Sequence, residues 1–225
     1  MTIDIETLRE PNRLDMLDEP ARFELANAVE QNFPRGATII RAHEPTRSIY
    51  VIREGAVKES QMTPEGKEVI LALLGPGDLF GDLAGTDSEA APTSAVAMMP
   101  TKVLAVPRAD WMRLLESQSS LARNVREWLA KRLSDAWRLV RMLSRYTTEA
   151  RLKSALVLLA ERWGQPSEDG GIEIALDLTH RTLADLAGAS REKVTRALGI
   201  LSQKGLVRVA KRRLVVPSLD RLHAE

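Results

Sequence analysis

The longest uninterrupted helical pattern in the chain runs from Ser119 to Thr147, a stretch that contains no glycine or proline. A helix of this length extends over about 40 Å at a rise of roughly 1.5 Å per residue. Its apolar residues recur at spacings of three and four, which indicates an amphipathic helix. The apolar stripe is too broad for one sheet to cover. We therefore expect the helix to pack on its own domain on one side and on a second helix on the other.

A second copy of the chain is the expected source of that second helix, which makes the segment a candidate dimer helix. The alternative is a long helix that packs wholly within one monomer. The residues that we assign to the dimer helix are Leu121, Val125, Leu129, Arg132, Ala136, Leu139 and Leu143.

Short apolar runs precede the long helix. Between Phe33 and Pro107 they are β-branched or alternating, and Gly, Pro and Asp separate them at near-regular intervals. Many short strands with this punctuation indicate an antiparallel sandwich or barrel. The first thirty residues instead carry short helical signals, such as the segment 21–30. The pattern at 108–118 predicts one more short helix before the long one.

A separate small domain is expected after Thr147. A helical pattern over 148–164 ends at Gly164-Gln165-Pro166, and a loop and an apparent strand over 172–178 follow. Two further helices are predicted over 180–188 and 190–205, with Thr179 and Ser190 as their N-cap residues. The segment 205–218 then predicts two short strands with basic residues at their turn.

The last two predicted helices have the pattern of a helix-turn-helix. Small residues at Ala184, Ala187 and Gly188 let the two helices approach closely, and Gly188 suits a sharp turn. In this motif the second helix enters the DNA major groove. At about 100° per residue, the apolar residues of the second helix occupy one sector of about 100°. Those apolar residues are Val194, Ala197, Leu198 and Leu201.

The polar residues of that helix are candidates for reading base edges. They are Arg191, Glu192, Thr195 and Arg196. An arginine can donate two hydrogen bonds to guanine O6 and N7, and a glutamate can accept one from cytosine N4. The alternative for Glu192 and Arg196 is a surface ion pair at i,i+4 spacing, worth about 0.2–0.5 kcal/mol.

A second group of residues suits contact with phosphate oxygens, which positions a protein on DNA without reading its sequence. The group comprises Thr179, Ser190, Lys193, Lys211, Arg212 and Arg213. The segment 179–213 holds nine Lys/Arg and two Asp/Glu, although the whole chain has a net charge of only +1. This concentration of positive charge favours a polyanionic partner, here double-stranded DNA. The alternative is an ordinary solvated basic surface.

Several other classes of protein do not fit the sequence. With no cysteine there can be no disulfide, thiolate zinc site or cysteine-ligated iron–sulfur cluster. No apolar run reaches the roughly 18 residues of a membrane span, and the N-terminus does not have the pattern of a signal peptide, so we expect a cytoplasmic protein without a membrane partner. The β-rich segment contains one histidine, His43, and no catalytic or metal-ligating cluster is evident. We expect neither an enzyme nor a metal site.

Two segments resemble the CRP/FNR family of bacterial transcription regulators. Residues 55–85 are similar to the effector-domain core of that family, and residues 182–207 are similar to its DNA-binding motif. The resemblance extends from about Phe33 to Pro217. It implies an α+β fold with an antiparallel β jelly-roll, cyclic-nucleotide-binding-like domain over 1–110, a dimerisation helix region over 111–146 and a winged helix-turn-helix domain over 147–225.

The same resemblance implies a function. The chain is expected to be a transcription regulator, and an activator rather than a repressor, that binds a palindromic operator with TGTGA-like half-sites as a homodimer. Arg191, Glu192 and Arg196 match the base-reading positions of the family. The loop 164–171 corresponds to a surface that contacts RNA polymerase in the family, and a plain solvent loop is the alternative.

The effector pocket departs from the cyclic-AMP pattern of the family. Its candidate residues here are Gly81, Asp82, Leu83, Thr93, Ala136 and Trp137. Pro92 stands where the family has the arginine for the cyclic phosphate, and no Lys or Arg occurs between Gly81 and Pro100. A buried phosphate without a cation is costly. Ala136 and Trp137 replace the pair that meets adenine. We therefore expect cyclic AMP to bind weakly or not at all, which leaves either no effector or a different one.

Overall fold

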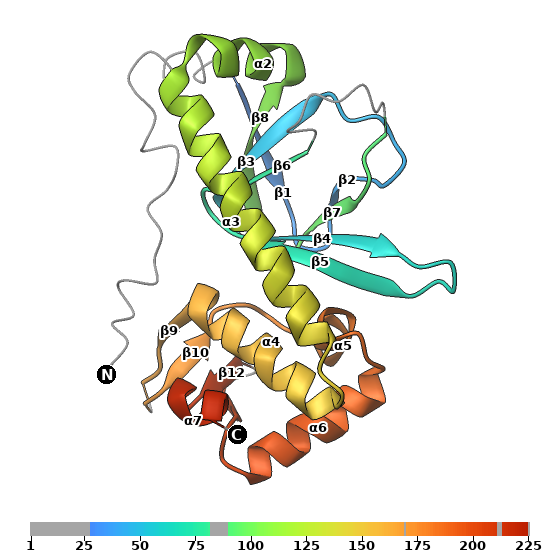
Figure 1. The fold of residues 1–225 in the computed structure, drawn as a ribbon, viewed down its shortest axis with the longest axis vertical. Coiled ribbons are helices and arrows are strands. Elements are labelled where there is room, and N and C mark those ends of the chain that lie inside the picture. Colours follow the sequence, from blue (N-terminus) through green and yellow to red (C-terminus); the bar gives the residue numbers. More distant parts are fainter. Residues whose placement is uncertain (1–27, 82–89, 169, 211–212, 225) are drawn as a thin grey trace. The chain divides into compact units, whose positions relative to one another are not determined.

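The computed structural model describes residues 28–81, 90–168, 170–210 and 213–224 (Figure 1). Contacts divide these residues into two compact units, which meet inside the long helix between Ala136 and Trp137. We call the part up to Ala136 the N-terminal unit and the part from Trp137 the C-terminal unit. No helix in the described ranges is both long and apolar enough to cross a membrane.

The N-terminal unit contains two four-stranded antiparallel sheets (Figure 1). One has the strand order β1-β8-β3-β6, and the other has the order β2-β7-β4-β5. Neighbours in space are seldom neighbours in sequence, as expected of a jelly roll. The strands are β1 (Val29–Phe33), β2 (Thr38–Ile40), β3 (Ser48–Glu54), β4 (Val57–Met62), β5 (Glu68–Leu74), β6 (Leu79–Gly81), β7 (Ser94–Ala97) and β8 (Thr101–Pro107).

Alternation along the strands separates two hydrophobic clusters, because successive side chains of a strand point to opposite faces. Ile52 of β3 lies in the first cluster together with Phe80, whose ring stacks on Tyr50 at a centroid distance of 5.0 Å. Ile49 and Val51 of the same strand lie in the second cluster, which also contains residues of the helices that follow β8. The β3 sequence thus supplies both layers of the core.

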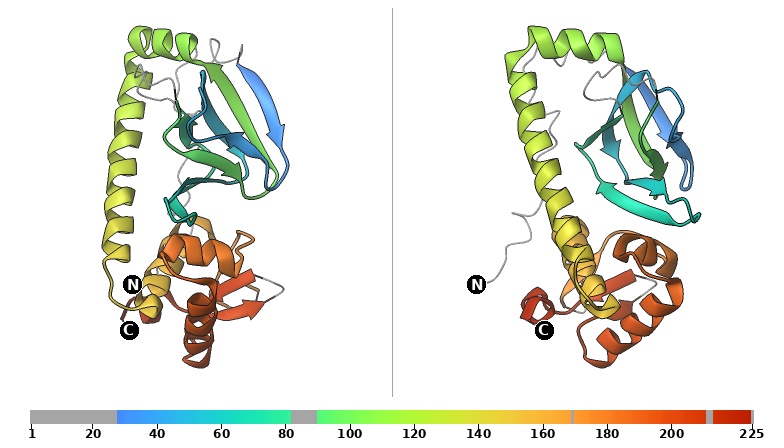
Figure 2. Two further views of the ribbon diagram at one scale, coloured as in Figure 1. Left: turned by 90° about the vertical axis from the view of Figure 1, so that its right-hand side faces the viewer. Right: turned by 45° about the vertical axis from the view of Figure 1, so that its right-hand side comes forward.

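Two helices follow the last strand, α2 (Arg108–Ser117) and α3 (Ser119–Leu143). Figure 2 shows α3 as one continuous helix, as the sequence predicts. Leu121, Val125 and Trp128 of α3 are buried in the cluster with Ile49 and Val51. Leu121 and Val125, which we assigned to the dimer helix, thus pack on the sheet of their own unit, and a dimer contact by these two residues stays a prediction. Periodicity identifies the apolar stripe but not which part of it faces which partner.

The C-terminal unit begins with the last part of α3 and continues with α4 (Thr148–Trp163), α5 (His180–Ala187) and α6 (Arg191–Gln203) (Figure 1). Its sheet has the order β11-β12-β10-β9. The strands are β9 (Gly164–Pro166), β10 (Ile172–Ile174), β11 (Arg208–Ala210) and β12 (Arg213–Val216), and α7 (Leu219–Ala224) follows them. Antiparallel β11 and β12 form the expected wing.

Local side-chain hydrogen bonds fix where the three helices begin. Thr147 Oγ1 accepts from the backbone N–H of Ala150, Thr179 Oγ1 from that of Thr182, and Ser190 Oγ from that of Lys193. These bonds satisfy amides that have no partner within the helix. The predicted caps Thr179 and Ser190 are thus confirmed.

Gly188 ends α5 with φ at +58° and ψ at +42°. This left-handed conformation is accessible to glycine at little cost and reverses the chain toward α6. A Cβ at this position would lie 3.1 Å from Leu143 Cδ2, so the turn packs closely on the end of α3. The predicted helix-turn-helix is therefore present, and its turn is held against α3.

Five elements differ from the expectation. The helical signal over 21–30 lies mostly outside the described residues, and its last two residues belong to β1. The short elements β6, β9 and α7 have no clear sequence pattern. The apparent strand over 172–178 ends at Ile174.

Candidate nucleic-acid interface

Helix α6 has one buried face and one exposed face. Val194, Ala197, Leu198 and Leu201 are buried, as the wheel predicts. The predicted base-reading residues are all exposed, namely Arg191, Glu192, Thr195 and Arg196. Buried leucines and valine fix the helix on its own unit, so the exposed residues form a rigid polar surface near its N-terminus. A surface of this kind fits the major groove.

Glu192 is held as a carboxylate acceptor. Its own backbone N–H and the Ser190 hydroxyl donate hydrogen bonds to it, and Arg191 and Arg181 add positive charge, which together lower the pKa of its carboxyl group. The Glu192 carboxylate therefore stays ionised at pH values where an ordinary glutamate is already protonated. Among the described residues no ion pair joins Glu192 to Arg196, so the alternative of an i,i+4 ion pair gains no support.

Thr195 makes two hydrogen-bond contacts on the exposed flank of α6. Its Oγ1 donates to the carbonyl oxygen of Arg191 at 2.9 Å and lies 2.8 Å from Nδ1 of His180, the first residue of α5. Both side chains are exposed. The contact joins the two helices of the motif on the polar side, and no pattern in the sequence singles out His180 for it.

The predicted phosphate contacts have different surroundings. Thr179 and Ser190 cap α5 and α6, and both are exposed, as is Lys193. Arg213 begins β12, and its Nε lies 3.4 Å from Glu173 Oε1 of β10. Lys211 and Arg212 lie outside the described residues. Of the three wing cations predicted to contact phosphate, only Arg213 is described, and its charge is partly neutralised by Glu173.

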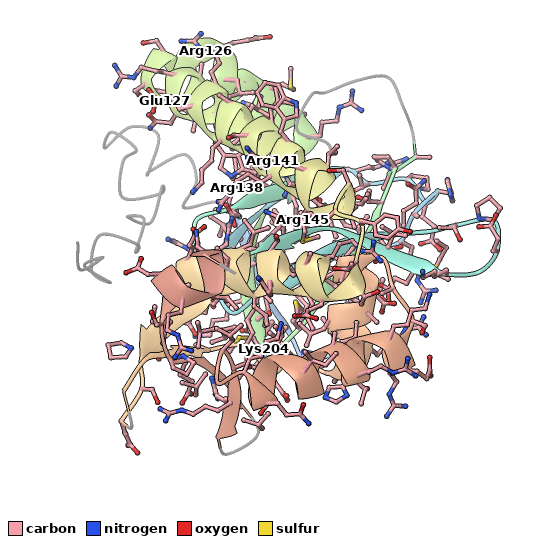
Figure 3. The ribbon with its side chains drawn as sticks, turned by 60° about the horizontal axis from the view of Figure 1, so that its bottom comes forward. Arg126, Glu127, Arg138, Arg141, Arg145 and Lys204 are labelled. Atoms are coloured by element: carbon pink, nitrogen blue, oxygen red, sulfur yellow. The ribbon has the colours of Figure 1, made fainter. Side chains whose placement is uncertain are left out.

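Three arginines lie at the C-terminal end of α3 and just after it, and Figure 3 labels them: Arg138 and Arg141 belong to α3, and Arg145 follows it. Arg138 pairs with Glu161 of α4, and Lys204, also labelled, pairs with Glu149 at 2.8 Å. Arg141 and Arg145 are exposed. The pairs connect α3 and α6 to α4 within the C-terminal unit.

An exposed apolar stripe runs along α3 next to the face that carries the buried Leu121 and Val125. Leu129 is 46% exposed, Leu133 is 52% exposed and Trp137 is 64% exposed. Val140 continues the stripe at 65%, and Ala136 is exposed beside it. Of the remaining residues assigned to a dimer contact, Leu139 and Leu143 are partly buried. An apolar stripe at helical spacing that remains open suits a second helix.

Arg132 of α3 pairs with a buried carboxylate of the β-rich domain. Its Nη2 donates to Glu59 of β4, whose side chain is only 11% exposed, and its guanidinium lies 5.5 Å from the ring centroid of Trp128. Its other terminal nitrogen, Nη1, is buried and has no partner among the described residues. Arg132, which we assigned to the dimer helix, thus has its described contacts within its own unit, and its part in a dimer stays a prediction.

Trp128 connects the same region to the loop before β6. Its Nε1 donates to Asp78 Oδ1 at 3.2 Å, and Asp78 Oδ2 accepts from the backbone N–H of Gly75 at 2.7 Å. Asp78 and Glu59 are both buried. Two carboxylates of the β-rich domain are therefore fixed by side chains of α3, an arrangement that the sequence reasoning missed.

The other predicted effector-pocket residues are only partly described. Gly81 ends β6 with φ at +102°, while Asp82 and Leu83 lie outside the described residues. Thr93 is half-buried and Pro92 is exposed. The indole of Trp137 is largely exposed in the single chain. No group of three or more metal-ligating side chains occurs among the described residues.

Two family models match the chain. A cyclic nucleotide-binding domain matches residues 30–118, and a Crp-like helix-turn-helix domain matches residues 150–225. The global nitrogen regulator of Synechococcus elongatus is 32% identical over 209 residues, which cover 92% of this chain and 93% of the relative. The cyclic AMP receptor protein of Thermus thermophilus is 33% identical, with 84% of this chain and 85% of the relative covered.

Solved structures of transcription regulators are also similar to this chain. FixK2 from Bradyrhizobium japonicum has a TM-score of 0.75 and 26% identity, covering 88% of this chain and 96% of its own. A CRP-family transcriptional regulator from Thermus thermophilus has a TM-score of 0.72 and 27% identity, covering 86% and 95%. These relatives are regulators of transcription and not enzymes.

Proposed function

Because the chain belongs to the CRP/FNR family of bacterial transcription regulators, we propose that it binds a palindromic operator as a homodimer and activates transcription there. The observation that carries this proposal is the exposed polar face of α6, where Arg191, Glu192 and Arg196 project from a helix fixed by buried apolar residues. Such a regulator works in the cytoplasm, where the bacterial chromosome lies.

The proposed operator has TGTGA-like half-sites. Arg191 and Arg196 would donate to guanine O6 and N7, and the ionised Glu192 would accept from cytosine N4. Thr179, Ser190 and Lys193 would contact phosphates at the edge of the groove, together with Lys211, Arg212 and Arg213 of the wing. The pair between Arg213 and Glu173 would weaken one of these wing contacts.

The proposed dimer uses the exposed stripe of α3, formed by Leu129, Leu133, Trp137 and Val140. Two copies joined along this stripe would each present one α6 to the duplex. A two-fold symmetric dimer of this type reads half-sites about 34 Å apart, one turn of DNA. The palindromic operator follows from that symmetry.

A fluorescence anisotropy titration with a palindromic TGTGA duplex and a scrambled duplex tests the proposal. Wild-type protein is expected to prefer the palindrome. Arg196→Ala is expected to cost about 1–3 kcal/mol on the cognate duplex and to relax discrimination at one base pair. Equal weakening on both duplexes would contradict a base-reading role for Arg196.

Activation requires contact with RNA polymerase, and we propose the loop 164–171 for this contact. In the structure this segment begins as β9, and Gln165 and Pro166 of β9 are exposed, as is Glu168 after it. Arg208 Nη2 donates to the carbonyl oxygen of Gly170 at 2.5 Å, which fixes the loop on β11. Transcription in vitro on a palindromic promoter, compared for wild-type protein and Glu168→Lys, tests the contact. Loss of activation with operator affinity retained is the expected result.

A second candidate function is regulation by a cyclic nucleotide, which the domain match and the buried Nη1 of Arg132 favour. Two observations argue against strong binding of the phosphate. No Lys or Arg occurs between Gly81 and Pro100, and Arg132 is already paired with Glu59. We propose weak cyclic AMP binding or none. Isothermal titration calorimetry of the wild-type protein with cyclic AMP distinguishes the two possibilities, because micromolar or tighter binding would establish regulation by a cyclic nucleotide.

A further inference from the structure

The contact between His180 and Thr195 assigns the single hydroxyl proton of Thr195. Thr195 Oγ1 lies 2.9 Å from the carbonyl oxygen of Arg191 and 2.8 Å from His180 Nδ1. A carbonyl oxygen can only accept, whereas an imidazole nitrogen can donate or accept. Both contacts are satisfied at once when Thr195 donates to Arg191 and His180 Nδ1–H donates to Thr195.

This arrangement selects one tautomer of His180. A neutral imidazole carries one proton, and with that proton on Nδ1 the lone pair lies on Nε2. Nε2 has no partner among the described residues, and His180 is exposed. The motif therefore presents a hydrogen-bond acceptor beside α6, while the Thr195 hydroxyl has no proton left for DNA.

The position of this acceptor follows from the helix geometry. Thr195 lies one turn after Arg191 and on the same flank of α6, because i and i+4 residues share a face. His180 extends this flank from the start of α5. In the major groove the groups that donate are the exocyclic amines, N4 of cytosine and N6 of adenine. Phosphate oxygens only accept, so they do not match a neutral Nε2.

We propose that His180, oriented by Thr195, is a further specificity-determining residue, whose Nε2 accepts a hydrogen bond from a cytosine or adenine amine beside the base read by Arg191. The inference rests on the proposed function, since it places His180 in the same DNA interface. It adds to each half-site one position that α6 alone does not read.

Selection from a pool of random duplexes tests the inference. The full-length protein is compared with His180→Phe, which keeps a planar ring without nitrogen, and with Thr195→Val, which keeps the shape without the hydroxyl. Ser202→Ala is the matched control, because Ser202 is exposed on the same flank of α6 two turns later. Thermal melting of each variant confirms that it folds.

Wild-type protein is expected to prefer C or A at one position of each half-site, by about fivefold for a single hydrogen bond. His180→Phe is expected to lose this preference and keep all others, and Thr195→Val to reduce it. Uniform weakening of all duplexes by His180→Phe would identify a phosphate contact and overturn the inference. Unchanged preferences would show a purely structural pair and also overturn it. A wild-type protein that selects no sequence would instead contradict the proposed function, and the inference with it.

Discussion

Arg151 Nε donates a hydrogen bond to the carbonyl oxygen of Ala187, 2.8 Å away, which ties α4 to the last turn of α5. The same guanidinium donates from Nη1 to the carbonyl oxygen of Arg145 at 3.0 Å, just after α3 ends. One side chain thus connects three segments around the helix-turn-helix. Because Gly188 also packs on Leu143, the turn of the motif and the end of α3 are joined by two independent contacts.

Arg151→Ala is expected to destabilise the C-terminal unit by about 1.5–3 kcal/mol, the usual contribution of hydrogen bonds to a charged group. Urea unfolding measures the loss. Arg151→Lys is the matched control, because an ammonium group keeps the charge but cannot reach both carbonyl oxygens with one planar fork. If the lysine variant were as stable as the wild type, the charge and not the double contact would be what matters.

Gly188→Ala is expected to cost about 1–2 kcal/mol, since alanine at φ +58° is strained. The close Leu143 Cδ2 is the end of a flexible side chain and can move aside. Gly188→Asn is expected to cost less, because asparagine tolerates this conformation. Gly199→Ala on α6 has open space around its Cβ and is expected to stabilise the helix by about 0.5–1 kcal/mol. Opposite signs for the two alanine variants in thermal melts would confirm the turn geometry.

Arg132→Met is expected to destabilise the N-terminal unit by about 2 kcal/mol or more, because it leaves Glu59 buried without its partner. Adding Glu59→Gln to this variant is expected to recover much of the loss, since no uncompensated charge then remains. A double-mutant cycle in urea measures the coupling between the two side chains. Additive losses would show that the pair contributes nothing beyond its separate parts.

Glu192 gives the protein a stability contribution that depends on pH. Its pKa is lowered in the folded protein, so the contribution is fully present above the pKa of an unfolded glutamate, about 4.3, and is lost as the pH falls through the lower folded value. Glu192→Gln removes the ionisable group. We expect the difference in urea midpoint between wild type and variant to shrink as the pH falls below about 4.3. A constant difference over that range would contradict the lowered pKa.

The sequence predicted the elements whose signals are local. The helices α4, α5 and α6 begin and end within a residue or two of expectation, because Thr179, Ser190 and Gly188 act on their immediate neighbours. The short elements β6, β9 and α7 have too few residues to show a period. Within the candidate site, the exposed face of α6 could be predicted, because the apolar residues of the helix identify its buried face and the polar residues lie opposite.

Contacts between distant residues could not be predicted in the same way. Arg132 and Glu59 are 73 positions apart, and nothing in the pattern of either segment specifies the other. His180 meets Thr195 only because the turn at Gly188 folds α5 against α6. Pairings of this kind depend on how the elements pack, which periodicity does not encode.

The two sides of α3 are expected to respond differently to substitution. Leu121 is buried against its own sheet, so Leu121→Ala should cost about 2–5 kcal/mol and lower the melting temperature of the N-terminal unit. Leu133 is half-exposed on the apolar stripe, so Leu133→Asp should leave the fold of one chain intact and separate the proposed dimer, because a carboxylate would be buried without a partner.

Sedimentation velocity and thermal melting, measured on both variants, distinguish the two effects. The expected result for Leu133→Asp is a monomer with a retained cooperative melt and much weaker binding to the palindrome, because one α6 reads only one half-site. Leu121→Ala is expected to melt earlier while the folded fraction stays dimeric. A dimeric Leu133→Asp variant would show that the stripe is not the contact, and the paired half-sites would then lose their structural basis.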